Sequence, residues 1–435
     1  MTTSPSEHEI DSHSATKSSV DITPAQLDEA KRYGRLELIC DLADKAIDLA
    51  FLAVMAFVFA QALDNWLAES IPRAGLRLAA MFANVTGLHI VISFPLSLYS
   101  GYVLEHRFGL SRQTLGRWLW RYVKRNLLVL AFGVAMFEGL YAIIWWTGPN
   151  WWWIAALAFF AVSVVLGHLV PVLILPLFYK IERIGAGRSG DAAANPEQEA
   201  KAAEVARRMA RLAEGTGLSI EGVYRMDLSS ETAKANAMLA GLGRTRRVIM
   251  GDTLLDGFTA DEIEVVFAHE IGHHVYRHIY KLIAIGVLLS AAGFWICDQI
   301  LRNWTGIGEP VVARSPDRDT ATTDLRSDRW QGRETLPQPA SYDQLPVASL
   351  PLLMFSLTVF SLLLEPLQNA ISRHFERQCD RYALDRTGLR EAYLSAFRKL
   401  AQLNKDDPKP NRIAVFLFHS HPPIAERLAM AQKTE

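Results

Sequence analysis

The segment TADEIEVVFAHEIGHH, residues 259–274, carries the strongest structural signal in this chain of 435 residues. Thr259 and Glu262 form a capping-box pattern before an apolar run, which predicts that a helix begins here. In that helix His269 and His273 lie one turn apart on the same face, so both imidazoles can bind one metal ion. The segment therefore predicts a helix with two of the ligands of a zinc ion.

Glu270 follows the first of these histidines directly and is rotated away from the metal. Its carboxylate can instead reach a metal-bound water and take a proton as that water attacks a peptide carbonyl polarised by zinc. The competing interpretation is that the histidines only line a helix face near lipid headgroups. His274 points away from the pair, and we expect His274 and His278 to lie at the interface or behind the ligands.

A third ligand is needed, because a catalytic zinc ion usually has three protein ligands and an open position for water. The best candidate is Glu376, in the segment ISRHFERQCDRYA, residues 371–383. Glu376 and Asp380 are four residues apart and present two carboxylates on one helix face. We expect Glu376 to bind the metal and Asp380 to orient a ligating histidine or to pass a proton to the leaving amine. The alternative is a solvated charged face paired with neighbouring arginines.

Half of the chain is hydrophobic, and this apolar content is concentrated in long runs. Each run has about the 20 apolar residues needed to cross a bilayer, and several are flanked by Trp or Tyr. Buried helices of a soluble protein are the competing interpretation. We expect six spans, at residues 46–63, 78–103, 127–146, 151–178, 282–301 and 347–367, with the third and fourth forming a tight hairpin.

The distribution of Lys and Arg predicts the orientation of these spans. The connection at residues 105–126 carries six basic residues, whereas the loop at 64–77 carries only Arg73 and Arg77. The richer side should be cytoplasmic. Both halves of the expected metal site then face the cytoplasm, in an integral multi-pass protein that we expect in a bacterial inner membrane.

The polar parts of the chain indicate its domains. Residues 1–31 lack the apolar core of a signal peptide and are expected to form a disordered, uncleaved tail. Residues 185–196 and 303–344 should be loops, 197–214 an amphipathic helix, and 236–239 with 247–250 a short hairpin. In chain order we expect a polar tail (1–43), a membrane domain of four spans (44–180), a peptidase part with the metal-binding helix (181–281), the fifth span (282–301), a polar extracytoplasmic loop (302–346), the sixth span (347–367) and a second peptidase part with the third ligand (368–435).

Charge and cysteine content narrow the possible functions. A formal net charge of −1 argues against nucleic acid as a partner. The three cysteines, Cys40, Cys297 and Cys379, are far apart and follow no CxxC spacing, so the sequence predicts neither disulfides nor a thiolate zinc site. Any metal must then be held by His and carboxylate ligands.

Several segments together resemble the type I CAAX prenyl proteases, which are membrane-embedded zinc endopeptidases of the gluzincin group. The resemblance covers roughly residues 40 to 430. Besides HEIGHH, the similar segments are PLSLY (95–99), FGLSRQT (108–114), PLFYK (176–180), VIMGDTLL (248–255), SRHFE (372–376) and SHPP (420–423).

This resemblance implies zinc on His269, His273 and Glu376, with Glu270 as catalytic base and Asp380 as proton donor. His421 and Arg427 would lie near the transition-state oxyanion or the substrate, and the strand at Asn236 would hold the substrate extended. The implied fold is mainly α: a multi-pass transmembrane helical barrel with a cytoplasmic gluzincin-type peptidase domain that contains a small β-hairpin. The implied substrates are prenylated C-termini or membrane proteins.

Three departures limit this transfer. We expect six spans where eukaryotic members have seven, residue 379 is Cys where the motif usually has Ala, and the 303–344 insertion has no recognised counterpart. High Ala, Arg and Leu usage favours a bacterial origin, so we favour hydrolysis of peptide or protein substrates, possibly lipidated, in a broad processing or quality-control role. The alternatives are a heat-shock-type membrane metallopeptidase and a non-enzymatic transporter or receptor.

Overall fold

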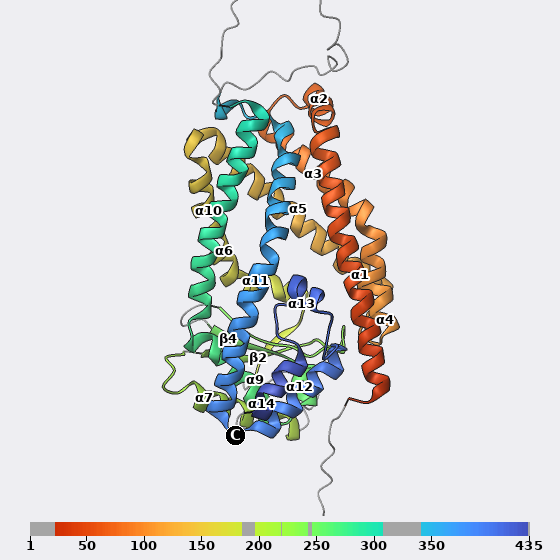
Figure 1. Cartoon of the computed structure of the whole chain (residues 1–435), viewed down its shortest axis with the longest axis vertical. Coiled ribbons are helices and arrows are strands. Elements are labelled where there is room, and N and C mark those ends of the chain that lie inside the picture. The colour runs from red at the N-terminus through yellow and green to blue at the C-terminus, as the bar shows by residue number, and fades with distance from the viewer. Residues whose placement is uncertain (1–21, 185–195, 219, 242–245, 308–340, 434–435) are drawn as a thin grey trace, which may run out of the picture.

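The molecule is elongated, with long helices at one end and a sheet with shorter helices at the other (Figure 1). This computed structural model describes residues 22–184, 196–218, 220–241, 246–307 and 341–433. The long helices are α1 (Pro24–Val54), α2 (Ala60–Ser70), α3 (Ala74–Leu98), α5 (Leu115–Thr147), α6 (Trp151–Leu169), α10 (His278–Thr305) and α11 (Leu350–Thr387), with the single turn α4 (Glu105–Arg107) after α3.

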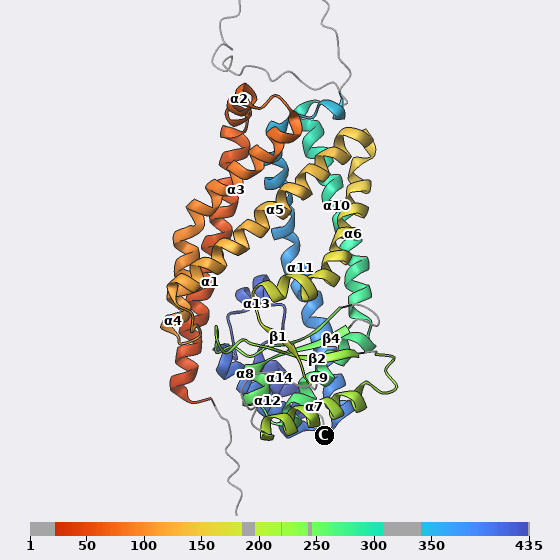
Figure 2. The ribbon, with the colours of Figure 1, turned by 180° about the vertical axis from the view of Figure 1, so that it is seen from behind.

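Five helical runs among the described residues are long and apolar enough to cross a membrane: Pro24–Ser70, Ala74–Arg107, Leu115–Gly167, His278–Thr305 and Val347–Thr387. We expected six spans. The difference lies in the third run, which contains both α5 and α6 joined by one turn at Gly148–Asn150. The chain reverses there, since Gly148 has a left-handed φ of 56° and α6 returns beside α10 (Figure 2).

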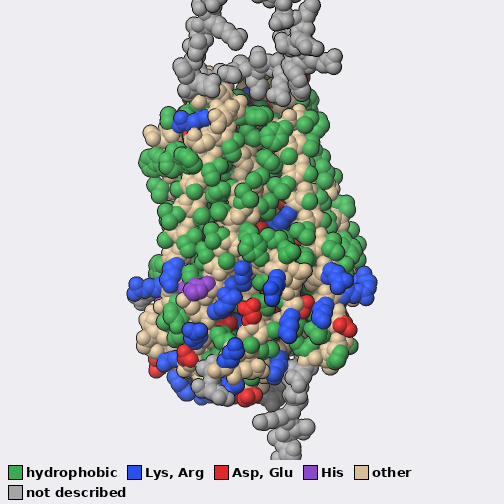
Figure 3. All heavy atoms as spheres, viewed as in Figure 1, with side chains coloured by type: hydrophobic (Ala, Val, Ile, Leu, Met, Phe, Trp, Pro, Cys, Tyr) green, Lys and Arg blue, Asp and Glu red, His purple; other side chains and the backbone are tan. Residues whose placement is uncertain are grey.

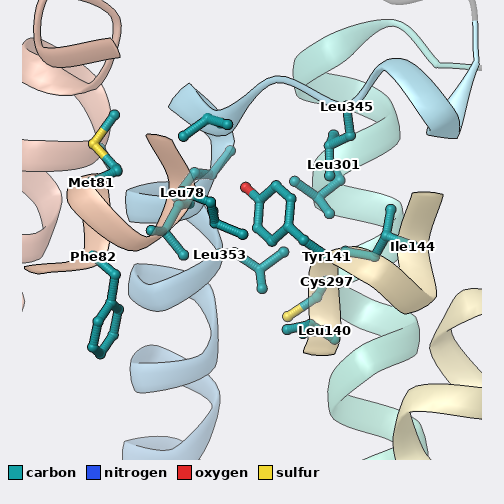
Figure 4. Packing of buried hydrophobic residues seen from close by; sticks show 14 of the residues in the cluster. Leu78, Met81, Phe82, Leu140, Tyr141, Ile144, Cys297, Leu301, Leu345 and Leu353 are labelled. Carbon is teal, nitrogen blue, oxygen red and sulfur yellow. The ribbon is translucent and has the colours of Figure 1, made fainter. Parts of the chain in front are cut away.

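We call the long helices α1, α2, α3, α5, α6, α10 and α11 the cage. They pack tightly at the end remote from the sheet. Figure 4 shows Leu78 of α3, Tyr141 of α5, Leu301 of α10 and Leu353 of α11 converging on one apolar cluster, and none of the four is more than 1% exposed. The lateral surface is also apolar, with hydrophobic side chains over the cage and charged ones gathered around the sheet end (Figure 3). An apolar exterior above a charged end is what a membrane-embedded helical domain requires.

A buried carboxylate connects three segments of the chain at the end of the cage remote from the sheet. Asp298 of α10 is 1% exposed and accepts hydrogen bonds from Trp151 Nε1 at 2.7 Å and Tyr342 Oη at 2.5 Å. Tyr342 lies in the expected 303–344 loop, whose first residues complete α10 and whose last form a turn at Tyr342–Gln344. Residues 308–340 of that loop, like the expected link at 185–195, lie outside the described residues.

A four-stranded mixed sheet forms the centre of the other end. Its order is β1-β2-β4-β3, from β1 (Ile181–Arg183), β2 (Ile220–Met226), β3 (Ala237–Ala240) and β4 (Arg246–Gly251). The expected hairpin is confirmed as the antiparallel β3–β4 pair, whereas β1 and β2 were not predicted. The surrounding helices are α7 (Pro196–Ala213), which confirms the expected amphipathic helix, α8 (Asp252–Gly257), α9 (Ala260–Val275), α12 (Arg390–Asn404), α13 (Arg412–Phe418) and α14 (Ile424–Lys433).

Helix α1 corrects the expected N-terminal tail. Residues 24–43 were assigned to that tail but are helical, because Thr23 and Gln26 form a capping box with Pro24 in the first turn. This polar half of α1 runs down beside the sheet end of the molecule (Figure 1) and buries Tyr33 and Cys40 in a small apolar cluster. This half of α1 is buried on one side only and is mostly polar. Its mean hydropathy is therefore too low for the hydropathy criterion that predicted the spans. The start of α1, the sheet and α14 all lie at the same end of the molecule (Figures 1 and 2).

Candidate metal centre

Helix α9 begins as expected. The Thr259 hydroxyl accepts a hydrogen bond from the Glu262 amide at 3.3 Å, and the Glu262 carboxylate accepts one from the Thr259 amide at 2.7 Å. The same carboxylate accepts a hydrogen bond from Lys399 of α12 at 2.7 Å, which connects the start of α9 to α12. The start of α9 thereby determines which face of the helix carries His269 and His273.

Helices α9 and α11 approach closely beside the two histidines. A Cβ atom added at Gly272 would lie 3.0 Å from the Cα atom of Cys379 and 3.1 Å from its sulfur, so only glycine permits this spacing without a shift. The approach brings Glu376, one turn before Cys379 along α11, onto the face of α9 that carries His269 and His273. Two segments about 100 residues apart in sequence therefore form one site.

The carboxylate of Glu376 lies between the two imidazoles. Its Oε2 atom is 3.0 Å from Nε2 of His269, and its Oε1 atom is 3.3 Å from Nε2 of His273. Burial alone would raise the pKa of Glu376, but the imidazoles of His269, His273 and His421 hold that pKa well below its ordinary value. Glu376 is therefore an ionised carboxylate in a buried position.

Asp380 lies behind His269. It is fully buried and accepts a hydrogen bond from Nδ1 of His269 at 2.9 Å, which leaves Nε2 of that ring facing Glu376. Burial alone would lower the pKa of His269, but the carboxylates of Asp380 and Glu376 raise it to about 9. Asp380 is not among the residues that line the cleft. Of the two roles expected for it, these contacts favour orienting His269; the role of proton donor stays a prediction.

Arg427 lies deeper than the resemblance implied. Its guanidinium donates from Nε to Asp380 at 2.9 Å, makes a second contact to the same carboxylate through Nη2, and stacks over the ring of Phe397 with 3.9 Å between Cζ and the ring centroid. The side chain is 7% exposed. Arg427 borders the cleft, but its guanidinium is directed at Asp380 and at Nδ1 of His269, which lies 3.4 Å from Nη2.

Glu270, Asn236 and His421 face an open cleft of about 720 Å³. His421 has a side chain 63% exposed and Nδ1 2.8 Å from Oε2 of Glu376, so it borders both the metal-binding atoms and the cleft. The Asn236 carbonyl accepts a hydrogen bond from the Gly251 amide at 2.9 Å, at the end of the edge strand β3. All three thus border the same cleft.

The donor set fits a divalent cation. Oε2 of Glu376 is buried and has no hydrogen-bond partner with acceptable geometry among the described residues, although two imidazole nitrogens lie within 3.0 Å. Glu376 and Asp380 place two carboxylates in the interior beside Arg427 and the imidazole of His269, which its raised pKa makes cationic when no metal is bound. A divalent cation between Glu376 and the imidazoles would replace this imidazole proton as the counter-charge of the buried carboxylates.

Cys379 offers a competing ligand set, since its sulfur and one nitrogen from each of His269 and His273 lie within 4.8 Å of one another. We favour Glu376 for two reasons. Its oxygens lie within 3.3 Å of the Nε2 atoms of both rings, whereas the Cys379 sulfur lies 3.6 Å from Nδ1 of His278. Burial also raises the pKa of the Cys379 thiol, and only the thiolate binds a metal well.

Two other parts of the cleft were not predicted from the sequence. Lys31 and Arg35 of α1 line it because the helix continues below the cage. Asp406, after α12, also lines the cleft; burial raises its pKa to about 6 although Lys234, His421 and Arg427 lie nearby. Asp406 stands beside Asp407 in a polar loop, and no sequence pattern distinguishes it as a residue of the cleft.

Asp406→Asn is expected to change how stability depends on pH. Because the folded-state pKa of Asp406 lies above its ordinary value of about 4, wild-type protein loses stability as pH rises from 4 through 6. The asparagine variant should lack this loss and be the more stable protein at pH 7, with the difference disappearing near pH 4. Melting temperatures of detergent-solubilised wild type and variant between pH 4 and 7 measure it. A difference that is constant over this range would contradict the assignment.

Paired imidazoles and a buried carboxylate at the junction of membrane helices and a polar cleft define the class of protein: a membrane metallopeptidase. The comparison with known families agrees. The chain belongs to peptidase family M48, whose model matches residues 199–435, and the model described as CAAX prenyl protease N-terminal, five membrane helices, matches residues 11–180. It is thus an integral multi-pass membrane protein of a zinc metalloprotease family. That description gives five membrane helices where we expected four spans.

Relatives of known sequence and structure support this assignment. The uncharacterized metalloprotease YhfN of Bacillus subtilis is 24% identical over 420 residues, covering 95% of this chain and 87% of that protein. CAAX prenyl protease 1 of Saccharomyces cerevisiae is 25% identical over 352 residues, covering 79% and 69%. The crystal structure of S. mikatae Ste24p has the same fold, with a TM-score of 0.72 at 22% identity over 94% of this chain and 89% of that one.

Proposed function

We propose that this chain is a zinc-dependent endopeptidase that hydrolyses peptide bonds of membrane-associated substrates. His269, His273 and Glu376 would hold one zinc ion. The observation that carries the proposal is the Oε2 atom of Glu376, which is buried beside the Nε2 atom of His269 and has no hydrogen-bond partner among the described residues. Glu376 lies on α11, which packs against α9. A solvated charged face, the competing interpretation of Glu376, would not be 4% exposed.

The residues of the chain then have distinct roles. When bound, zinc supplies polarisation of the scissile carbonyl and acidification of water. Glu270, on the cleft wall, accepts the proton of the attacking water and returns it to the leaving amine. His421 is placed to donate a hydrogen bond to the oxygen that becomes negative in the transition state. Asp380, held by Arg427, keeps His269 in the tautomer that presents Nε2.

The edge strand offers a way to bind the substrate backbone. Among the described residues β3 pairs only with β4, and the residue before it, Asn236, borders the same cleft as Glu270. An extended peptide can add to such an edge through main-chain hydrogen bonds, which hold any sequence in a fixed register. This arrangement suits a protease with many substrates better than one that reads a single side chain.

We place the active site on the cytoplasmic side of a bacterial inner membrane. The basic connection at residues 105–126 supports this orientation, and Arg121 and Lys124 lie beside Phe178 at the lower end of the cage. The similarity to a Bacillus subtilis protein supports the bacterial assignment. In such a membrane a prenylated substrate is not required, so we favour broad processing or quality control over dedicated prenyl-protein maturation; a heat-shock-type role is the second candidate.

Two matched reporters test this proposal. Purified protein in liposomes is given peptides that differ only in a farnesyl group on one cysteine, with and without a zinc chelator. We expect metal-dependent cleavage of both, restored by added Zn²⁺, with rates that differ by less than about tenfold, or 1.4 kcal/mol. A larger preference for the farnesylated peptide would instead establish prenyl recognition. Absence of metal-dependent cleavage of either peptide would overturn the endopeptidase assignment.

A further inference from the structure

The second histidine of the metal pair has its own supporting group. Nδ1 of His273 lies 3.2 Å from Nδ1 of His278, a histidine that is 0% exposed. The His278 ring stacks on Phe375 with 4.1 Å between centroids and 8° between planes, so its orientation is fixed by packing. When two imidazole nitrogens are in contact, one must donate and the other must accept.

The contact of His278 with Gln378 determines which of the two Nδ1 atoms donates the hydrogen bond. Nε2 of His278 lies 2.9 Å from Oε1 of Gln378, and an amide oxygen only accepts, so the His278 proton is on Nε2. The buried ring is disfavoured in its charged form, which leaves Nδ1 of His278 as an acceptor. His273 must then donate from its own Nδ1. Its Nε2 lone pair is left free on the side of Glu376.

The same order of donor and acceptor continues through Gln378 to the surface. The side-chain amide nitrogen of Gln378 lies 3.2 Å from Nε2 of His374, an exposed histidine one turn earlier on α11. Each link of the chain His273, His278, Gln378 and His374 therefore has one donor and one acceptor. No member needs a second proton or a charge.

The backbone explains how a residue five positions after His273 returns to it. Helix α9 ends at Val275, Arg277 adopts a left-handed φ of 56°, and α10 starts at His278. A continuous helix would turn the side chain at 278 away from His273. The break at Arg277 redirects the chain into the membrane span and folds the His278 ring back beneath the metal site.

We propose that His278 is a positioning residue for metal binding: supported by Gln378, it holds His273 in the tautomer and orientation that present Nε2 to zinc. This rests on the proposed zinc site. It gives His273 a neutral partner in the place where His269 has the carboxylate Asp380. Removing such a partner typically weakens metal binding by about 10–100-fold.

Zinc affinity, measured by competition with a chelator, tests the role without reference to turnover. His278→Phe keeps the stacking ring but removes the acceptor, and its affinity should fall by about 10–100-fold. His278→Asn places an oxygen near the position of Nδ1 and should restore most of the affinity. His274→Phe is the matched control: that ring contacts Arg246 rather than His273, so the affinity should not change.

Two comparisons keep the test decisive. If His278→Phe does not fold, as judged by gel filtration of the metal-free protein, Gln378→Met and Gln378→Glu replace it: the first removes the acceptor for His278 and should weaken binding, and the second keeps it. Wild-type affinity in His278→Phe or Gln378→Met, or equal loss in the phenylalanine and asparagine variants, would overturn the role of His278. Zinc bound normally by His273→Ala would instead overturn the metal site itself.

Discussion

Replacing Glu270 with glutamine is expected to lower the rate of peptide cleavage by about 10²–10⁴-fold, because the amide cannot take the proton of the attacking water. The substitution removes no metal ligand and keeps the size of the side chain, so the zinc content should stay at one ion per chain. Glu270 lies on the cleft wall and is partly exposed, so the change should leave the packing of α9 intact.

Initial rates of reporter cleavage and zinc content, measured on the same preparations, check this expectation. Glu264→Gln is the matched control: it lies on the same helix but pairs with Arg208 at 2.9 Å, away from the cleft. Undiminished cleavage in Glu270→Gln would show that the base lies elsewhere. Loss of zinc in that variant would show that Glu270 binds the metal.

Replacing His269 with alanine should abolish both zinc binding and cleavage. Three protein ligands are the usual minimum for a catalytic zinc ion, and this substitution also leaves Asp380 and Arg427 without their connection to the metal. Metal analysis of purified protein should find about one zinc ion per wild-type chain and almost none in the variant.

His274→Ala provides the control for this variant, since it removes an imidazole from the same helix without removing an expected ligand. Equal zinc content in His269→Ala and wild type would eliminate the proposed metal centre. Zinc loss in both His269→Ala and His274→Ala would point to unfolding of α9 rather than loss of a ligand. Circular dichroism of the metal-free proteins separates these two results.

Local signals predicted much of the fold. The capping box at Thr259 placed the start of α9, and the spacing of His269 and His273 determined their shared face within it. Glu376 and Asp380, four residues apart on α11, do reach the same histidine, one at Nε2 and the other at Nδ1. In each case the information lies within one or two helical turns, which is the range over which sequence periodicity acts.

What the sequence did not predict depends on contacts between distant segments. β2 is partly buried along most of its length, and its sequence shows no clean alternation of apolar and polar residues, so no strand was predicted there. The lower half of α1 is held by Tyr33, whose hydroxyl donates to Glu105 at 2.6 Å, a contact 72 residues apart. His278 was expected only as an interfacial or supporting residue. Its contact with His273 requires the backbone break at Arg277, and an arginine at that position does not predict such a break.

The most direct test of the metal site is an anomalous difference map at the zinc edge from crystals of the zinc-loaded protein. We predict a single peak between Nε2 of His269, Nε2 of His273 and the carboxylate of Glu376, at about 2.0–2.2 Å from each. A peak bound at about 2.3 Å by the sulfur of Cys379 in place of Glu376, or no peak between the two imidazoles, would contradict the account.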